Sequence, residues 1–215
     1  MTRTWTRGSR PARAGASLAL AIALVGSVAA CSESGSITSP SAHPSDVVGQ
    51  NYQSGDGSVT TWAESSRGAP VVLKGTDFEG KTVDVSAWRG GVVVINNWYA
   101  GCPPCRAEAP GLVRLANQGA ASGVHWVGID GVDDAGAAQA FQRTFAVPYP
   151  SIADTDGLAV AALQGSVPIQ AVPTTVVLDR QGRVAARVLG QADESTLKAL
   201  IDGVIAESPG ASATP

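Results

Sequence analysis

The chain has 215 residues, of which 44% are hydrophobic and 15% are charged, and its formal net charge is −3. This composition is typical of one globular domain with additional segments and excludes an intrinsically disordered protein. The chain has no stripe of basic residues to neutralise phosphate groups, so we expect no nucleic-acid partner.

The first 30 residues have the pattern of a secretion signal. Four arginines and no acidic residue are followed by an uncharged apolar run from Leu18 to Ala30. The small residues Val28-Ala29-Ala30 before Cys31 resemble the lipobox of bacterial lipoproteins, in which the cysteine receives lipid. A plain signal peptide is the alternative, although it would leave an exposed thiol at Cys31 in an oxidising compartment. A retained membrane span is disfavoured, because spanning needs roughly 20 apolar residues. We therefore predict a lipoprotein signal peptide at 1–30 and a lipid anchor at Cys31, on the extracytoplasmic face of the cell membrane.

Residues 31–66 are rich in Ser and Gly and lack a periodic apolar pattern, which predicts a flexible tether. Val71–Leu73 and Thr82–Val85, on either side of a Gly-containing turn, then predict a β-hairpin. The uncharged run Val92–Trp98 shows no alternation, as in a strand buried on both faces. We expect this strand to be central.

The rest of the chain alternates between helix and strand patterns, and Pro110 should kink the first helix because proline lacks an amide donor. This order predicts an α/β domain over 67–206, with a mixed central sheet flanked by helices and an N-terminal β-hairpin extension. A disordered tail should follow at 207–215. The helices are expected at Arg106–Gln118, Asp134–Phe145, Gly157–Gln164 and Asp193–Ala206, and the strands at Val124–Asp130, Ser151–Ala153, Val172–Asp179 and Arg183–Leu189.

Cys102 and Cys105 are the two cysteines that lipidation does not explain. The loop between them is so short that a disulfide would stabilise the fold little, so redox chemistry is the better explanation. A zinc site is disfavoured, because only His43 and His125 are available as further soft ligands. Copper delivery is disfavoured too, since the single methionine is Met1. We expect no metal and no cofactor other than the redox-active cysteine pair.

The two cysteines are predicted to have unequal roles. A thiol at a helix N-terminus meets the positive end of the helix dipole, which favours the attacking thiolate. Cys102 is thus the expected nucleophile, and Cys105, one turn inward, the resolving thiol. Pro103 and Pro104 carry no amide hydrogen to stabilise the thiolate, which favours a reductant over an oxidant.

Several motifs carry a family resemblance. The Cys-Pro-Pro-Cys motif that opens the first long helix, with Val172-Pro173-Thr174 later in the chain, resembles the thioredoxin fold. Asn96–Trp98, Glu108–Pro110 and Pro173–Thr175 resemble the membrane-tethered extracytoplasmic thioredoxins of the TlpA/ResA type, over roughly 69–206. The resemblance implies thiol-disulfide exchange with exported proteins, often the reduction of apocytochrome c before haem attachment, and a membrane thiol electron donor.

The resemblance also implies roles for individual residues. Glu108, three residues after Cys105 on the same helical face, would exchange a proton with the thiol pair; a solvated glutamate paired with a cation is the alternative. Pro173 would be cis, although an ordinary trans proline at the start of an edge strand is possible. Val172 would then offer backbone groups to an extended substrate segment, and Trp98 would flank the thiols.

Two positions depart from the family pattern. Gly101 stands where a tryptophan is common before the first cysteine, so the surface beside the reactive sulfur is less aromatic. Asn96 stands where many cytoplasmic thioredoxins carry a buried aspartate, and an amide cannot shuttle a proton.

The sequence thus predicts a monomeric, membrane-anchored thiol-disulfide oxidoreductase that acts as a reductase. An oxidative-folding thiol oxidase or isomerase would use the same residues and is the main alternative. A redox-silent binding lipoprotein would need no paired cysteines. A peroxiredoxin is disfavoured, because Ile95 and Tyr99 stand where its motif requires Pro and Thr.

Overall fold

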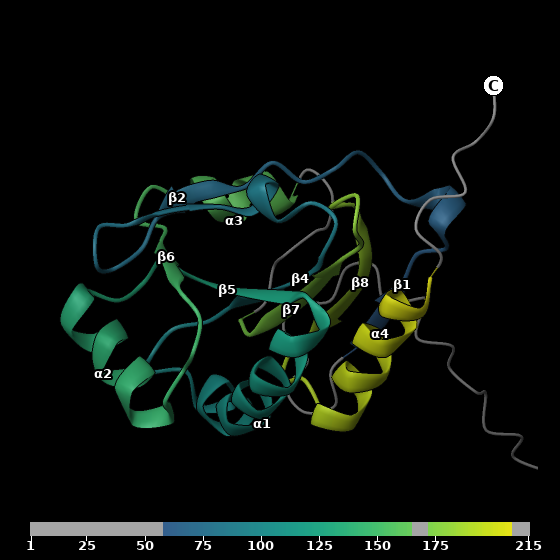
Figure 1. Ribbon diagram of the computed structural model, residues 1–215. Coiled ribbons are helices and arrows are strands. Elements are labelled where there is room, and N and C mark those ends of the chain that lie inside the picture. The colour runs from purple at the N-terminus through teal and green to yellow at the C-terminus, as the bar shows by residue number, and fades with distance from the viewer. Residues whose placement is uncertain (1–57, 165–171, 208–215) are drawn as a thin grey trace, which may run out of the picture. The chain divides into compact units, whose positions relative to one another are not determined.

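The computed structural model describes residues 58–164 and 172–207 (Figure 1). The predicted signal peptide at 1–30, Cys31, the tether as far as residue 57 and the tail from residue 208 lie outside these ranges. Among the described residues, no helix has the length and apolar character needed to cross a membrane.

Six strands form one mixed sheet with the order β1-β8-β7-β4-β5-β6. Strand β4 is parallel to β5, and β5 to β6, whereas the pairs β4–β7, β7–β8 and β1–β8 are antiparallel. All six residues of β4 are buried, so the predicted central strand and mixed α/β class are confirmed. The strands are β1 Ser58–Thr61, β4 Val92–Asn97, β5 Val124–Asp130, β6 Ser151–Ala153, β7 Thr174–Leu178 and β8 Val184–Leu189.

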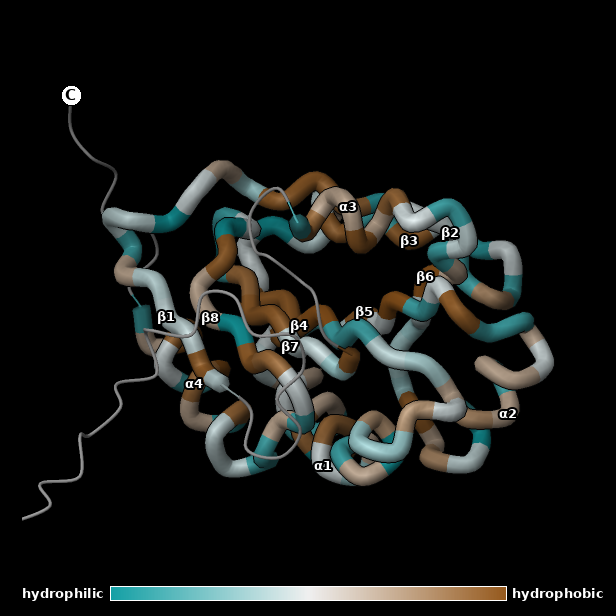
Figure 2. The backbone as a smooth tube through the Cα atoms, turned by 180° about the vertical axis from the view of Figure 1, so that it is seen from behind, coloured by the Kyte–Doolittle hydropathy of each residue, from teal (hydrophilic) through white to brown (hydrophobic). Residues whose placement is uncertain are grey.

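Helices and a hairpin cover the two faces of this sheet. Helices α1 and α4 lie on one face, and α3 and the antiparallel β2–β3 hairpin lie on the other (Figure 1). Successive residues of β4 serve both cores, with Val92 and Val94 toward α1 and α4, and Val93 and Ile95 toward the hairpin and α3. Figure 2 shows the hydrophobic residues concentrated along these inner strands. The elements are α1 Pro103–Gly119, α2 Ala135–Phe145, α3 Leu158–Gln164, α4 Glu194–Ala206, β2 Lys74–Thr76 and β3 Thr82–Asp84, with 3-10 turns at Glu64–Ser66, Val85–Trp88 and Ala120–Ser122.

The domain begins earlier than the sequence predicts. Residues 58–66, assigned above to the tether, form β1 and a 3-10 turn, and β1 pairs with β8 along its whole length. At the other end Glu207, assigned to the tail, accepts two hydrogen bonds from the buried Arg67 at 2.7 and 2.5 Å. Arg67 also pairs with Asp179 at 3.0 Å. Contacts between distant segments therefore fix both boundaries, and these contacts leave no local sequence pattern.

Two local predictions also need correction. The first hairpin strand is Lys74–Thr76 instead of Val71–Leu73, and Val72 is exposed. Helix α1 begins at Pro103, three residues before the predicted start, because prolines fit the first turn of a helix, where amide donors have no partner. The helix continues through Pro110.

Candidate active site

Cys102 and Cys105 form a disulfide at the N-terminus of α1, with their Cα atoms 5.2 Å apart. Cys102 is the N-cap residue, and its Sγ accepts a hydrogen bond from the amide of Cys105 at 3.2 Å. The first two helical residues are Pro103 and Pro104, which have no amide hydrogen to offer. The sulfur of Cys102 therefore faces the positive end of α1 but has one amide donor from the first turn of the helix.

An aromatic cluster surrounds the disulfide. Cys102 and Cys105 are only 1% and 2% exposed, and they pack with Trp98, Phe141 and two alanines. Trp98 stacks on Phe141 with ring centroids 4.2 Å apart and donates its indole N–H to Ser151 at 3.2 Å. Trp98 lies beside the thiols, as predicted. Because Trp98 is only 3% exposed, it is not available for substrate contact in this oxidised state.

Glu108 is buried on α1, one turn after Cys105. Its Oε1 accepts a hydrogen bond from the side-chain amide of Asn96 at 2.9 Å, and its Oε2 accepts one from the backbone N–H of Ala192 at 2.7 Å. Burial raises the pKa of Glu108 to about 7, and these two hydrogen bonds oppose the rise. The alternative of a solvated glutamate paired with a cation is wrong, because Glu108 is 4% exposed and no ion pair among the described residues includes it.

A small cavity lies between Cys105, Asn96 and Tyr149. Its volume of about 10 Å³ is near the minimum that holds one water molecule. Burial, together with the negative charge of Glu108, raises the pKa of the Tyr149 hydroxyl, so this group stays protonated. Asn96 cannot carry a proton, yet it connects the carboxyl group of Glu108 to the cavity beside Cys105.

Pro173 lies at the start of β7, and the Val172–Pro173 peptide bond is cis, as predicted. The carbonyl oxygen of Pro173 accepts the amide of Gly190 at 2.9 Å. Val172 packs against the cluster around the disulfide. The fold thus brings Val172, which precedes Pro173 far along the chain, to the cluster around the thiols.

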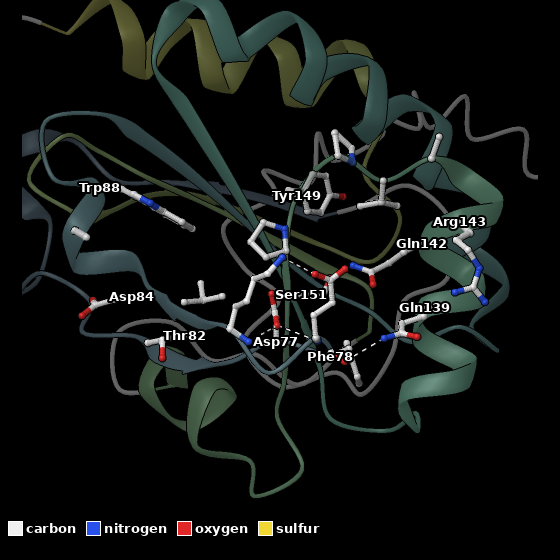
Figure 3. Close-up of a pocket in the computed structure, with 18 residues that line it drawn as sticks. Asp77, Phe78, Thr82, Asp84, Trp88, Gln139, Gln142, Arg143, Tyr149 and Ser151 are labelled. Carbon is white, nitrogen blue, oxygen red and sulfur yellow. Dashed lines mark hydrogen bonds and ion pairs between the residues drawn. The ribbon is translucent and has the colours of Figure 1, made fainter.

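A cleft of about 1010 Å³ lies between the β2–β3 hairpin, α2 and the segment that leads into β6 (Figure 3). Its labelled walls include Phe78 and Thr82 on one side and Gln139 and Arg143 of α2 on the other. Gln139 donates to the carbonyl oxygen of Phe78 at 3.0 Å and so ties the two walls together. Tyr149 lines both this cleft and the cavity beside Cys105. No sequence pattern predicts the cleft, because widely separated segments form it.

Two further acidic residues lie at the end of β5, and one of them contacts the turn before Cys102. The carboxylate of Asp133 accepts the backbone N–H of Ala100, two residues before Cys102. Asp130 ends β5 and is fully buried. Asp130 was predicted only as the end of a strand. The available signal was topological: loops that follow neighbouring parallel strands meet at the same edge of a sheet.

No three His, Cys, Asp or Glu side chains within 58–164 and 172–207 are grouped so that they could hold a metal ion. His125 stacks on Trp88, with ring centroids 5.3 Å apart and planes 8° apart. His43 lies outside the described residues.

The chain is similar to known thiol-disulfide exchange proteins. The Redoxin family matches residues 55–201. The chain is 28% identical over 163 residues to the thiol:disulfide interchange protein HelX of Rhodobacter capsulatus, covering 74% of this chain and 89% of HelX. It is 27% identical to the thiol-disulfide oxidoreductase ResA of Bacillus subtilis, covering 63% of this chain and 72% of ResA.

Among solved structures, a secreted thiol-disulfide isomerase from Corynebacterium glutamicum superposes with a TM-score of 0.65 at 28% identity. The match covers 69% of this chain and 92% of the isomerase. With a disulfide at the N-terminus of α1, a cis Val172–Pro173 bond whose Val172 packs against the cluster around that disulfide, and a buried carboxyl group one helical turn away, the chain belongs to the Redoxin family as a thioredoxin-fold thiol-disulfide oxidoreductase of the TlpA/ResA type.

Proposed function

We propose that the protein is a membrane-anchored, extracytoplasmic reductase of disulfides in exported proteins, and that it acts as a monomer. The observation that carries the proposal is the buried Glu108, whose pKa of about 7 lets it take up and release a proton beside Cys105 at neutral pH. The direction of electron flow is supported by the single first-turn amide on the sulfur of Cys102. A poorly stabilised thiolate makes the reduced form a better electron donor.

The reaction begins with the reduced protein. The Cys102 thiolate attacks one sulfur of the substrate disulfide, and the other substrate sulfur leaves as a thiolate. Cys105 then passes its proton to the Glu108 carboxylate and attacks the sulfur of Cys102. The second substrate sulfur leaves, and the two substrate thiolates take up two protons. Two electrons have moved to the substrate, and the protein is left with the disulfide present in the structure.

Val172 and Pro173 are the proposed substrate-binding residues. Val172 packs against the cluster around the disulfide, and a cis peptide bond joins it to Pro173. A substrate segment in extended conformation would pair with the backbone of Val172. This pairing would place its cysteine next to Cys102.

The TlpA/ResA resemblance supports apocytochrome c as a substrate. Its haem-attachment motif, Cys-x-x-Cys-His, presents the close pair of thiols that such a reductase would keep reduced. A membrane thiol donor would regenerate the Cys102–Cys105 thiols. Lipid at Cys31 would hold the domain near both partners.

Thiol trapping and a redox titration test the proposal. Wild-type protein should reduce an oxidised Cys-x-x-Cys-His peptide, Cys102→Ser should be inactive, and Cys105→Ser should accumulate the mixed disulfide. The Cys102–Cys105 couple should have a potential more negative than the glutathione couple. A potential well above that of glutathione would instead establish an oxidative-folding enzyme, and a Cys102→Ser protein with full activity would refute the assigned roles.

The anchor is tested separately. In a bacterial host that processes lipoproteins, the full chain should partition with membranes, and Cys31→Ser should release it to the soluble extracytoplasmic fraction. A wild-type protein found only in the soluble fraction would refute the anchor and leave the redox proposal standing.

A further inference from the structure

Hydrogen bonds to both backbone groups of Ala100 fix the turn that carries Cys102. The backbone N–H of Ala100 donates to the carboxylate of Asp133, and its carbonyl oxygen accepts a hydrogen bond from Arg106 at 3.2 Å. The amide of Cys102 donates to the carbonyl oxygen of Tyr99 at 3.2 Å. Cys102 is 1% exposed, so an external thiol or disulfide reaches its sulfur only when this turn moves.

Asp133 has a second acidic residue, Asp130, as its neighbour. The carboxyl groups of Asp130 and Asp133 are within hydrogen-bonding reach of each other. Oδ1 of Asp130 accepts the amides of Val132 and Asp133 at 3.0 and 3.1 Å. Oδ2 of Asp130 is buried and has no hydrogen-bond partner in the described part of the chain. A proton on this oxygen would turn it into a donor toward Asp133 and complete its hydrogen bonding.

Two adjacent carboxylates repel each other, so such a pair retains one proton to a higher pH than either group would alone. Burial raises the pKa of Asp130 to about 6, and the neighbouring charge of Asp133 adds to the effect of burial; two backbone amides act in the opposite direction. Asp130 is the more buried of the two, with 0% exposure, and is therefore the better place for the proton.

We propose that Asp133 is a positioning residue for the active-site turn, and that a proton held by Asp130 keeps the Asp133 carboxylate in place as the acceptor for Ala100. When Asp130 loses this proton, repulsion between the two carboxylates weakens the bond to Ala100. The turn then opens more often, and the sulfur of Cys102 becomes more accessible.

The neighbouring charged groups do not neutralise the pair. Asp154 uses both carboxyl oxygens on amides at the start of α3, and Asp134 caps α2 through the amide of Ala137. Arg106, from α1, contacts the carbonyl side of Ala100 and lies over two phenylalanine rings. None of the ion pairs found within 58–164 and 172–207 includes Asp130 or Asp133.

The test measures how fast dithiothreitol reduces the Cys102–Cys105 disulfide of the full-length protein. The bond from Ala100 to the charged Asp133 is a strong one, so its loss in Asp133→Ala should speed reduction by about tenfold or more. Asp133→Asn keeps an acceptor oxygen and should speed reduction less. Asp202→Asn, which removes an exposed acid from α4, is the matched charge control and should have no effect.

The pH profile separates this role from simple structural support. Asp130→Asn stays neutral and can donate to Asp133, so its turn should remain closed at every pH. The ratio of the wild-type rate to the Asp130→Asn rate should therefore rise several-fold between pH 5 and pH 8, with its midpoint near pH 6. The ionisation of dithiothreitol cancels in this ratio.

NMR supplies a second readout that does not depend on reduction. In wild-type protein the amide proton of Ala100 should titrate with the same midpoint, and in Asp130→Asn it should not. A rate ratio that stays flat from pH 5 to pH 8, or an unchanged reduction rate in Asp133→Ala, would overturn the proposal. If Asp133→Ala fails to fold, the pH dependence of the wild-type to Asp130→Asn rate ratio and the NMR titration of the Ala100 amide proton still test the proposal. Because the probe is dithiothreitol, these results are independent of whether the natural reaction is reduction or oxidation.

Discussion

Replacement of Glu108 by glutamine should remove a large part of the pH dependence of stability. The pKa of Glu108 rises from its ordinary value of 4.5 to about 7 in the folded protein. The folded state thus holds the proton more tightly than the unfolded chain, and the free energy of unfolding falls as the pH rises between these two values. The fall from this one group amounts to roughly 2–3 kcal/mol between pH 5 and pH 8. Glu108→Gln has no charge to bury, so its free energy of unfolding should not show this fall.

Glutamine introduces a cost of its own. Both partners of Glu108, the side-chain amide of Asn96 and the backbone N–H of Ala192, are donors. The NH₂ group of a glutamine would face one of them, which destabilises the variant by roughly 1–3 kcal/mol at every pH. The informative quantity is therefore the change in stability with pH, and not the stability at one pH.

Urea unfolding of the oxidised protein at pH 5 and pH 8 measures this quantity. Wild-type stability should fall by roughly 2–3 kcal/mol more than that of Glu108→Gln over this range. The exposed Glu64→Gln is the matched control and should follow the wild type. Equal pH dependence in wild type and Glu108→Gln would show that Glu108 titrates like a solvated glutamate, and would remove the basis for its proton-exchange role.

Three further substitutions test the packing and the helix ends by urea unfolding. Gly128→Ala would place a Cβ on the hydroxyl of Ser151 and the indole nitrogen of Trp98, so we expect a loss of about 1–3 kcal/mol; a neutral effect would mean that this contact can relax. Asp134→Ala removes the side-chain cap on the Ala137 amide and should cost about 1 kcal/mol, whereas an unchanged midpoint would mean that α2 does not depend on it. Arg114→Ala breaks an exposed ion pair on α1 and should leave the midpoint unchanged, because solvent screens such pairs; a clear loss would contradict that view.

The local elements were predictable because their signals are local. The uncharged run Val92–Trp98, which shows no alternation, predicted the central strand. Two helices were predicted to start at Asp134 and Asp193, and both residues are N-caps in the structure. Strand β1 was not predictable, since Ser58–Thr61 is polar and becomes a strand only by pairing with β8. The same holds for the bond between Asp133 and Ala100, which depends on the parallel pairing of β4 and β5.

The sequence predicts which residues of the candidate site lie close together, but it does not predict how deeply each is buried. The spacing of Cys102, Cys105 and Glu108 places all three on one turn and a half of helix, so their proximity follows from helical geometry. The burial of Glu108 does not follow from it. The carboxyl group is buried because Asn96 of β4 and the segment before α4 close over it. Periodicity gives the face of a helix, but it does not tell which distant segments cover that face.

In the proposed mechanism the two sets of acidic groups act on different sulfurs, so the two steps of the reaction should respond separately to pH. Glu108 lies on the same helix as Cys105, one turn away, so helical geometry keeps its position relative to that thiol. The Asp130–Asp133 pair reaches Cys102 only through Ala100 and the turn. Burial raises the pKa of Glu108 to about 7, so the fraction of Glu108 that can act as a base increases as the pH rises from 5 to 8. Attack by Cys105 should speed up over this range, and the lifetime of the mixed disulfide with substrate should shorten. A lifetime that stays constant from pH 5 to pH 8 in quenched-flow trapping would refute proton exchange between Cys105 and Glu108.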